Sequence, residues 1–277
     1  MAPGLSSPSN LTVRTVSAML FVPVVLLLIL VGGWALFLLV LFIVVRGSWE
    51  FFAMARQSGR RPLTHLGLLL AAALCLHIHL AGTEHLIPAL LAIALIIFTA
   101  TLFRGTTDFS VNVLLTLGGV IYLGLMGSAP LLITASAGPE LRQEAGRLVA
   151  VLFLCIWLTD AVAYLAGRQF GRRKLAPRIS PAKTIVGALA GLAGGLLPVG
   201  LVGFLPSFCV LRLSGLLLLA SVGGQTGDLV ESAIKRDLGV KDAPPLIPGH
   251  GGVLDRFDSY LFALPLSYIY ITLLRIY

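Results

Sequence analysis

Residues 16–45, VSAMLFVPVVLLLILVGGWALFLLVLFIVV, carry no charged side chain, and Gly32-Gly33 is the one marked break in the apolar run. About 20 apolar residues are enough to cross the hydrocarbon core of a bilayer. Because a glycine pair can turn the chain, we predict two membrane helices here, over 15–31 and 33–52. One long tilted helix over the same residues is the alternative.

Similar apolar segments recur along the rest of the chain. Hydrophobic residues make up 57% of the 277 residues and charged residues 12%, which is about half the charged share of a soluble domain. We therefore predict an all-α, polytopic transmembrane helical bundle, a single integral-membrane domain over 1–277 with N-terminal helices over 15–145 and a more highly charged half over 146–277. In addition to the two helices above, seven segments bring the total to about nine transmembrane helices: 64–81, 86–103, 111–135, 146–167, 184–205, 211–231 and 254–276.

The net charge of +8 is distributed unevenly between the helix ends. If Gly32-Gly33 is a turn, 16 of the 20 Lys and Arg residues fall on one side of the membrane, and the exceptions are Arg142, Arg147, Arg212 and Arg275. The positive-inside rule places the richer side in the cytoplasm. Such a surface attracts anionic lipids and nucleotides. The basic runs lack interleaved aromatic residues, so nucleic-acid binding is not expected.

Three small residues, Gly187, Gly191 and Gly195, recur at every fourth position. In membranes this spacing is typical of closely packed helices. We therefore predict that they form a packing surface, with a lipid-lining role as the alternative. The same surface is compatible with a homodimer but does not establish one.

The stretch 232–258, SAIKRDLGVKDAPPLIPGHGGVLDRFD, is unusually polar for this chain. It contains a glycine-rich turn over 248–252 that brings backbone N–H groups within reach of a ligand. Carboxylates that suit a metal therefore lie beside cations that suit phosphate. The charged residues are Lys235, Arg236, Asp237, Lys241, Asp242, Asp255, Arg256 and Asp258.

Two further acids, Asp160 and Asp228, lie inside apolar runs. A charge at bilayer depth costs about 2.5–3.5 kcal/mol even on lenient scales, so such acids indicate a function. Asp160 shares a helix face with Tyr164 and Arg168. Asp228 begins a polar stripe that predicts a cavity, with a structural ion pair as the alternative; the stripe continues through Glu231, Ser232 and Lys235.

Asp255 and Asp258 are three residues apart at the start of the last predicted helix, so their carboxylates project from one face. Oxygen ligands of this kind suit Mg²⁺. Acids that complement the helix dipole are the alternative.

The segment 167–184, GRQFGRRKLAPRISPAKT, holds six cations in eighteen residues. A basic loop of this kind commonly anchors the chain at the cytoplasmic side. However, Ser180, Lys183 and Thr184 come just before a predicted helix, whose free N–H groups favour phosphate.

These motifs resemble those of the phosphatidate cytidylyltransferase family, also called CDP-diacylglycerol synthases. The stretch 232–258 fits the pattern S-x-x-K-R-x4-K-D-x5-P-G-H-G-G-x-x-D-R-x-D, and upstream W-x-x-D-x-x-A-Y-x-x-G-R-x-x-G and S-P-x-K-T fit residues 157–171 and 180–184. The resemblance covers residues 157–258, and the N-terminal half shares only its hydropathy. One departure is Val186, where the family often has an acidic or amide residue.

The resemblance implies an enzyme that joins CTP and phosphatidate to give CDP-diacylglycerol and pyrophosphate, with one or two Mg²⁺ ions. It also implies a bacterial inner (plasma) membrane location with the active site on the cytoplasmic side. The implied catalytic residues are Asp228, Asp255, Lys235, Arg256 and Asp258, of which Asp228, Asp255 and Asp258 bind metal. The implied substrate-binding residues are Ser180, Lys183, Thr184, Arg236, Lys241, His250, Gly251, Gly252, Asp160 and Arg168.

Three other functions are alternatives. A CTP-dependent kinase for a polyprenol-type lipid would need a base, and Asp160 is the candidate. A lipid or ion transporter would be expected to show inverted repeats, whereas the charged motifs here occur only in the second half. Val186 is the one indication of a non-catalytic family member.

Overall fold

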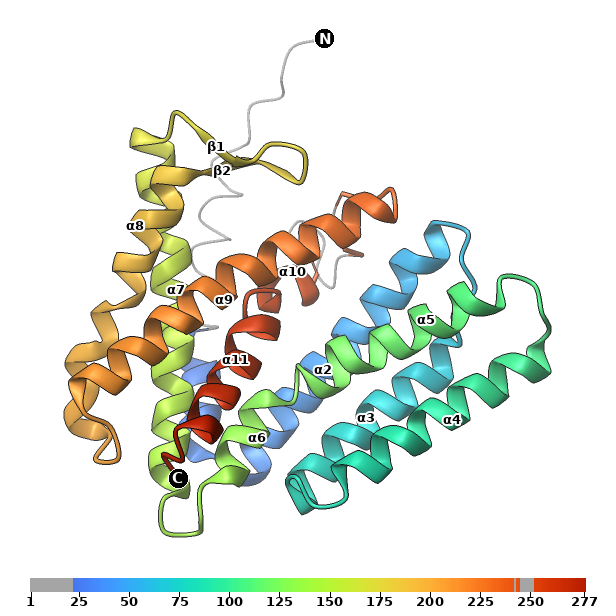
Figure 1. Ribbon diagram of the computed structural model, residues 1–277, viewed down its shortest axis with the longest axis horizontal. Coiled ribbons are helices and arrows are strands. Elements are labelled where there is room, and N and C mark those ends of the chain that lie inside the picture. Colours follow the sequence, from blue (N-terminus) through green and yellow to red (C-terminus); the bar gives the residue numbers. More distant parts are fainter. Residues whose placement is uncertain (1–21, 242, 245–251) are drawn as a thin grey trace.

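The computed structural model describes residues 22–241, 243–244 and 252–277, and almost all of its regular structure is helical (Figure 1). The predicted all-α membrane class is confirmed. The elements are a helix over Val22–Val31, α2 (Gly33–Gln57), α3 (Thr64–Ala81), α4 (Leu86–Arg104), α5 (Phe109–Gly119), the π-helical segment η1 (Val120–Leu125), α6 (Ala129–Ser136), α7 (Arg142–Phe170), β1 (Lys174–Ala176), β2 (Ser180–Thr184), α8 (Ile185–Gly195), the 3-10 helix η2 (Leu197–Phe204), α9 (Val210–Asp237), α10 (Leu254–Phe257) and α11 (Tyr260–Leu273).

Six helices in the described part of the chain are long and apolar enough to cross a membrane, or seven if the bent α5–η1–α6 segment is one span. The predicted count of nine is therefore not confirmed. The predicted segment 111–135 bends by 46° between η1 and α6. The predicted segment 254–276 divides into α10 and α11, and α11 has 14 residues, fewer than a span requires.

The chain breaks at the glycine pair, as the two-helix prediction requires. One helix ends at Val31 and α2 begins at Gly33. Gly32 and Gly33 have φ values of 70° and 50°, in the left-handed region that glycine adopts without a steric penalty. Two helices, not one long helix, therefore occupy this stretch.

The glycine ridge of α8 packs against α7 of the same chain. A Cβ at Gly187 would lie 2.7 Å from the carbonyl oxygen of Ala163, and one at Gly191 would lie 2.9 Å from that of Thr159. The packing prediction is confirmed. Because these glycines are already buried within the chain, they give no support to a homodimer.

The basic segment before α8, expected as a loop, contains two short strands. Strands β1 and β2 pair antiparallel, with Lys174 opposite Thr184 and Ala176 opposite Ser180. The hairpin is the exception to the all-helical pattern within the described residues. Its short, basic strands lack the apolar alternation by which a strand is normally recognised.

The helices form three groups in Figure 1. On one side lie α7, α8 and α9, on the other α3, α4 and α5, and between them α2, α6 and α11. The start of α7, the start of α9 and the C-terminus lie at the lower edge, while the hairpin and the end of α9 lie at the upper edge. This arrangement agrees with the predicted separation of the cations into two groups, and which group faces the cytoplasm stays a prediction.

Candidate active site

A cavity of about 730 Å³ collects the polar residues of the C-terminal half. Its walls come from α7, the β1–β2 hairpin, α8, α9 and the α10 segment. The charged residues that line it are Asp160, Arg168, Lys174, Lys183, Asp228, Lys235, Asp255, Arg256 and Asp258.

On one wall, Lys183 and Asp228 form an ion pair. The Lys183 Nζ lies 2.6 Å from Asp228 Oδ2, joining the end of β2 to the middle of α9. The Ser232 hydroxyl donates to the other oxygen, Asp228 Oδ1, at 3.4 Å. Both charged side chains remain partly exposed, Lys183 at 24% and Asp228 at 32%. Of the predicted polar stripe on α9, Asp228 and Lys235 line the cavity, whereas Glu231 and Ser232 do not, and Glu231 forms a buried ion pair with Lys235, as the alternative predicted.

Two turns further along α9, Lys235 bridges two acids. Its Nζ lies 2.5 Å from Glu231 Oε2 and 2.8 Å from Asp255 Oδ1. The second oxygen of Asp255 accepts the Gly252 N–H at 3.0 Å. Burial alone would raise the pKa of Asp255, but the bonds from Lys235 and Gly252 outweigh it and the pKa is lowered. Asp255 is therefore held as a carboxylate.

Two more acids, Asp160 and Asp258, meet at Ser259. The Ser259 hydroxyl donates to Asp160 Oδ2 at 3.4 Å, and the Ser259 N–H donates to Asp258 Oδ1 at 2.6 Å. Burial, followed by the charges of Asp228 and Glu231, raises the pKa of Asp258 well above its usual range. A cation placed near these acids would relieve that repulsion.

The donor set suits a hard divalent cation, because all the acids offer oxygen atoms. Within the described residues, however, no three acids, histidines or cysteines are grouped closely enough to hold a metal ion. Asp255 is bound to Lys235 and Gly252, and Asp228 is bound to Lys183. The chemistry of the predicted Asp228, Asp255 and Asp258 set therefore fits a metal, but the three are not gathered around one point here.

The structure places the predicted substrate-binding residues unevenly. Asp160, Arg168 and Lys183 line the cavity, whereas Ser180, Arg236, Lys241 and Gly252 do not. His250 and Gly251 lie outside the described residues.

Thr184 lines the cavity, but its hydroxyl is already engaged. Thr184 Oγ1 accepts the Gly187 N–H at 3.1 Å and so caps the start of α8. The residue is 5% exposed. The side chain therefore has a structural task, and its neighbour Lys183 presents the accessible charge.

Comparisons with known proteins identify the family. Residues 12–274, nearly the whole chain, match the family model described as "Cytidylyltransferase family". The chain belongs to the cytidylyltransferase family.

Among the relatives of this cytidylyltransferase is the phosphatidate cytidylyltransferase of Synechocystis sp., which is 35% identical over 290 residues covering 95% of this chain and 97% of the relative. The enzyme of the same name from Staphylococcus aureus is 49% identical over 129 residues, 46% of this chain and 50% of the relative. The corresponding Staphylococcus saprophyticus enzyme is 46% identical over 129 residues, with the same shares covered. The resemblance deduced from the motifs is confirmed.

Two acids of this cytidylyltransferase were not predicted as site residues. Glu231 was recognised as part of the stripe, but not as a partner of Lys235; its side chain is 1% exposed. Glu50 is fully buried in α2 and binds the start of α10. Its i,i+4 spacing from Arg46 was the available signal, and nothing local to Glu50 indicates a partner about 200 residues away.

Proposed function

We propose that this chain is a phosphatidate cytidylyltransferase, which transfers the cytidylyl group of CTP to phosphatidate and forms CDP-diacylglycerol and pyrophosphate. The single observation that carries the proposal is a cavity, in a protein with membrane-spanning helices, whose lining includes both carboxylates and lysines paired with them. Family membership and the full-length relative from Synechocystis support the same activity.

The reaction needs no nucleophile from the enzyme. An oxygen of the phosphatidate phosphate forms a bond to the α-phosphorus of CTP, and the bond between that phosphorus and the oxygen bridging to the β-phosphate breaks, releasing pyrophosphate. A phosphate monoester has its second pKa at about 6, so the attacking group is largely ionised at neutral pH. The protein must instead neutralise charge and align the two phosphates.

Lysine side chains of the cavity are placed for this task. Lys183 and Lys235 are each held by a carboxylate, so their ammonium groups are fixed before substrate arrives. Arg168 and Arg256 also line the cavity. We propose that Lys183 and Arg168 bind CTP phosphates, and that Lys235 and Arg256 stabilise the charge that develops at the reacting phosphates.

A divalent metal fits the donor chemistry, with Asp228, Asp255 and Asp258 as the proposed ligands for one or two Mg²⁺ ions. When bound, such an ion stabilises negative charge on phosphoryl oxygens. The Lys235 bond to Asp255 and the Lys183 bond to Asp228 must then loosen, which the long lysine stems allow.

The test is product analysis with protein purified in detergent. Labelled CTP, phosphatidate and Mg²⁺ should yield a CDP-lipid and pyrophosphate. Formation of a phosphorylated lipid and CDP from an added polyprenol would instead show a kinase, and no nucleotide-dependent product would contradict both.

We further propose that 1–277 is one integral-membrane domain in the bacterial inner membrane, with the 168–183 segment and the cavity on the cytoplasmic side. A cysteine placed in that segment should resist impermeant maleimides in intact cells and react after lysis. Labelling from outside would exclude the orientation.

A homodimer stays a prediction, which light scattering with detergent correction can check.

A further inference from the structure

Glu50 has no place in the reaction described above, yet its side chain is wholly buried and bound on every side. Its Oε1 accepts the Val253 N–H at 3.0 Å and its Oε2 accepts the Leu254 N–H at 2.7 Å. Arg46 Nε lies 3.1 Å from Oε1, which balances the charge. A buried carboxylate with this many partners is a fixed structural element.

The two N–H groups belong to the start of α10, the short helix that carries Asp255 and Arg256. The first N–H groups of a helix have no acceptor within the helix. At α10 the N-cap residue Val253 supplies no side-chain acceptor. Glu50 therefore caps the helix from α2, about 200 residues earlier in the sequence.

Gly252 has a corresponding reason to be glycine. A Cβ there would lie 2.6 Å from Glu50 Oε2 and 2.7 Å from the Cβ of Ala243. The same residue donates its N–H to Asp255 Oδ2 at 3.0 Å. The backbone of this turn is thus enclosed by Glu50 on one side and Asp255 on the other, with no room for a side chain.

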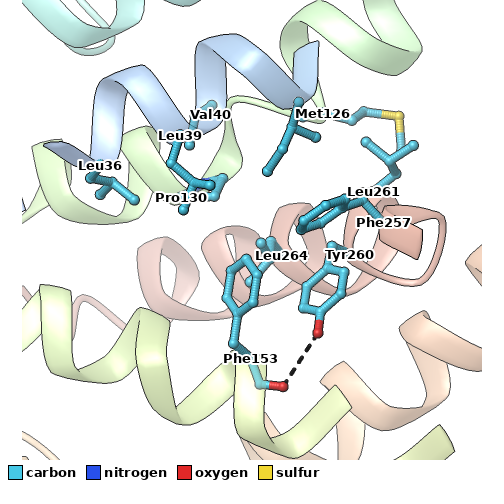
Figure 2. Close-up of a pocket in the computed structure, with 12 residues that line it drawn as sticks. Leu36, Leu39, Val40, Met126, Pro130, Phe153, Phe257, Tyr260, Leu261 and Leu264 are labelled. Atoms are coloured by element: carbon cyan, nitrogen blue, oxygen red, sulfur yellow. Dashed lines mark hydrogen bonds between the residues drawn. The ribbon is translucent and has the colours of Figure 1, made fainter. Parts of the chain in front are cut away.

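Apolar packing holds α2 against the same segment. Figure 2 shows Leu36 and Leu39 of α2 across a small apolar cavity from Phe257, Leu261 and Leu264. The cavity measures about 20 Å³. Beside Glu50, buried Phe51 of α2 belongs to one apolar cluster with Leu254 of α10 and Leu261 of α11. Glu50 is therefore attached to a helix that cannot shift freely relative to α10 and α11.

We infer that Glu50 is a positioning residue of the active site: its carboxylate sets the orientation of α10 and, through it, the placement of Asp255, Arg256 and Asp258 in the cavity. This inference rests on the proposed function. It assigns to the N-terminal half, which the motif resemblance does not reach, a direct part in building the catalytic segment.

The experiment compares Glu50→Gln with Glu144→Gln in full-length protein. Glu144 is the matched control, since it is also a buried carboxylate (6% exposed) that binds the backbone, accepting the Ser207 N–H at 2.8 Å and the Ser207 hydroxyl at 3.0 Å. Ser207 belongs to the α9-preceding loop and does not line the cavity. Both variants should lower the melting temperature by similar amounts.

Their kinetics should differ. Misplacing reacting groups by about 1 Å costs up to about 10²-fold in rate, so Glu50→Gln should lower kcat by about 10- to 10²-fold. KM values for CTP and phosphatidate should change by less than about threefold, because the binding cations Lys183 and Arg168 are attached to other elements. Glu144→Gln should keep kcat within about twofold.

Two more variants test the inference even if Glu50→Gln fails to fold. Glu50→Asp keeps the charge on a shorter stem and should recover part of the kcat lost in Glu50→Gln. Gly252→Ala presses a methyl group against an intact Glu50 and should reproduce the kcat loss. If Glu50→Gln does not fold, these two decide the matter, and normal kcat in both would overturn the inference.

Other results are equally decisive. Wild-type kcat in folded Glu50→Gln, or equal kcat losses in Glu50→Gln and Glu144→Gln, would overturn the positioning role. Wild-type protein that makes no CDP-lipid would instead contradict the proposed function, so the two failures are distinguishable.

Discussion

Glu50 and Glu144, both in the N-terminal half, accept hydrogen bonds from backbone N–H groups of the C-terminal half, and Glu50 also pairs with Arg46. Asp228 and Glu231 instead pair with lysine side chains that line the cavity. A backbone donor cannot withdraw without unfolding a segment. A lysine ammonium on a four-carbon stem can exchange its carboxylate for a phosphate or leave it to a metal. Whether an acid binds the backbone or a lysine thus separates groups that hold the fold from groups that can take part in chemistry.

Asp255 lies between the two classes, since one oxygen binds the Gly252 N–H and the other binds Lys235. It can stay attached to the scaffold while its second oxygen changes partner. Four predictions test whether this distinction holds, beginning with the largest expected effect.

The largest effect is expected for Lys235→Met. This change leaves Glu231, 1% exposed, without its cation, and breaking such a buried pair costs about 3–5 kcal/mol. We expect a large fall in thermal stability and no measurable transfer.

The double variant Glu231→Gln/Lys235→Met removes the orphaned charge as well and should recover most of the stability without the activity. Recovery of both would mean that Lys235 is only a structural counter-ion. Thermal unfolding in detergent solution measures the stability, and a cytidylyl-transfer assay measures the activity.

The second prediction concerns the proposed metal ligands. Asn keeps the size of Asp but removes the charge, so Asp228→Asn and Asp255→Asn should fold and lose about 10²-fold or more in rate. The stabilisation that Mg²⁺ gives to wild-type protein in a thermal shift should disappear in both.

Asp258→Asn is the informative companion, because Asp258 carries a carboxyl whose pKa is raised by burial and by Asp228 and Glu231. Removing its charge should raise the melting temperature without Mg²⁺. Near-normal activity in both Asp228→Asn and Asp255→Asn would exclude the metal assignment.

The third prediction concerns Lys183. Lys183→Ala should raise KM for CTP by about tenfold, equivalent to about 1.4 kcal/mol, because a partly exposed ammonium near the start of α8 is lost. Stability should change little. The control Arg178→Ala removes a charge at the exposed hairpin turn and should leave KM unchanged; unaltered kinetics in Lys183→Ala would return this segment to a purely anchoring role.

The smallest effect is expected at the adjacent residue, Thr184. Its hydroxyl binds the backbone N–H of Gly187 and so belongs to the scaffold class. Loss of an N-cap costs about 1 kcal/mol, so Thr184→Ala should lower stability by that amount and leave KM for CTP unchanged. Thr184→Ser, which retains the cap, should behave as wild type. A raised KM in Thr184→Ala with normal stability would place Thr184 in the substrate site, as the sequence motif suggests.

The features predicted correctly are those that depend on the spacing of residues close together in the sequence. Apolar runs predicted the helices, and Gly32-Gly33 predicted the break between the first two. The i,i+3,i+4,i+7 spacing from Asp228 to Lys235 predicted the polar stripe. In each case the relevant residues lie within one or two helical turns of each other. The glycine ridge of α8 also belongs here, since its spacing alone indicated a packing surface.

What the sequence did not reveal depends on distance or on weak local preference. The β1–β2 hairpin has no apolar alternation. The bend between η1 and α6 did have a local signal, Gly127-Ser128-Ala129-Pro130, but its apolar flanks made the segment read as one span. The contact between Glu50 and Val253 joins residues about 200 positions apart. The metal ligands were expected to converge, but a pattern of acids does not disclose which of them are already bound to lysines.

The close approach of α7 and α8 has a mechanical consequence. At Gly187 and Gly191 the two helices touch backbone to backbone, with no intervening side chain that could change rotamer to absorb sliding. The pair therefore resists sliding, which keeps Asp160 and Arg168 of α7 in a fixed relation to the start of α8. Widening of the cavity to admit a nucleotide is then expected from the β1–β2 hairpin, which carries Lys183 and joins the two helices, because α10 is held to α2 through Glu50.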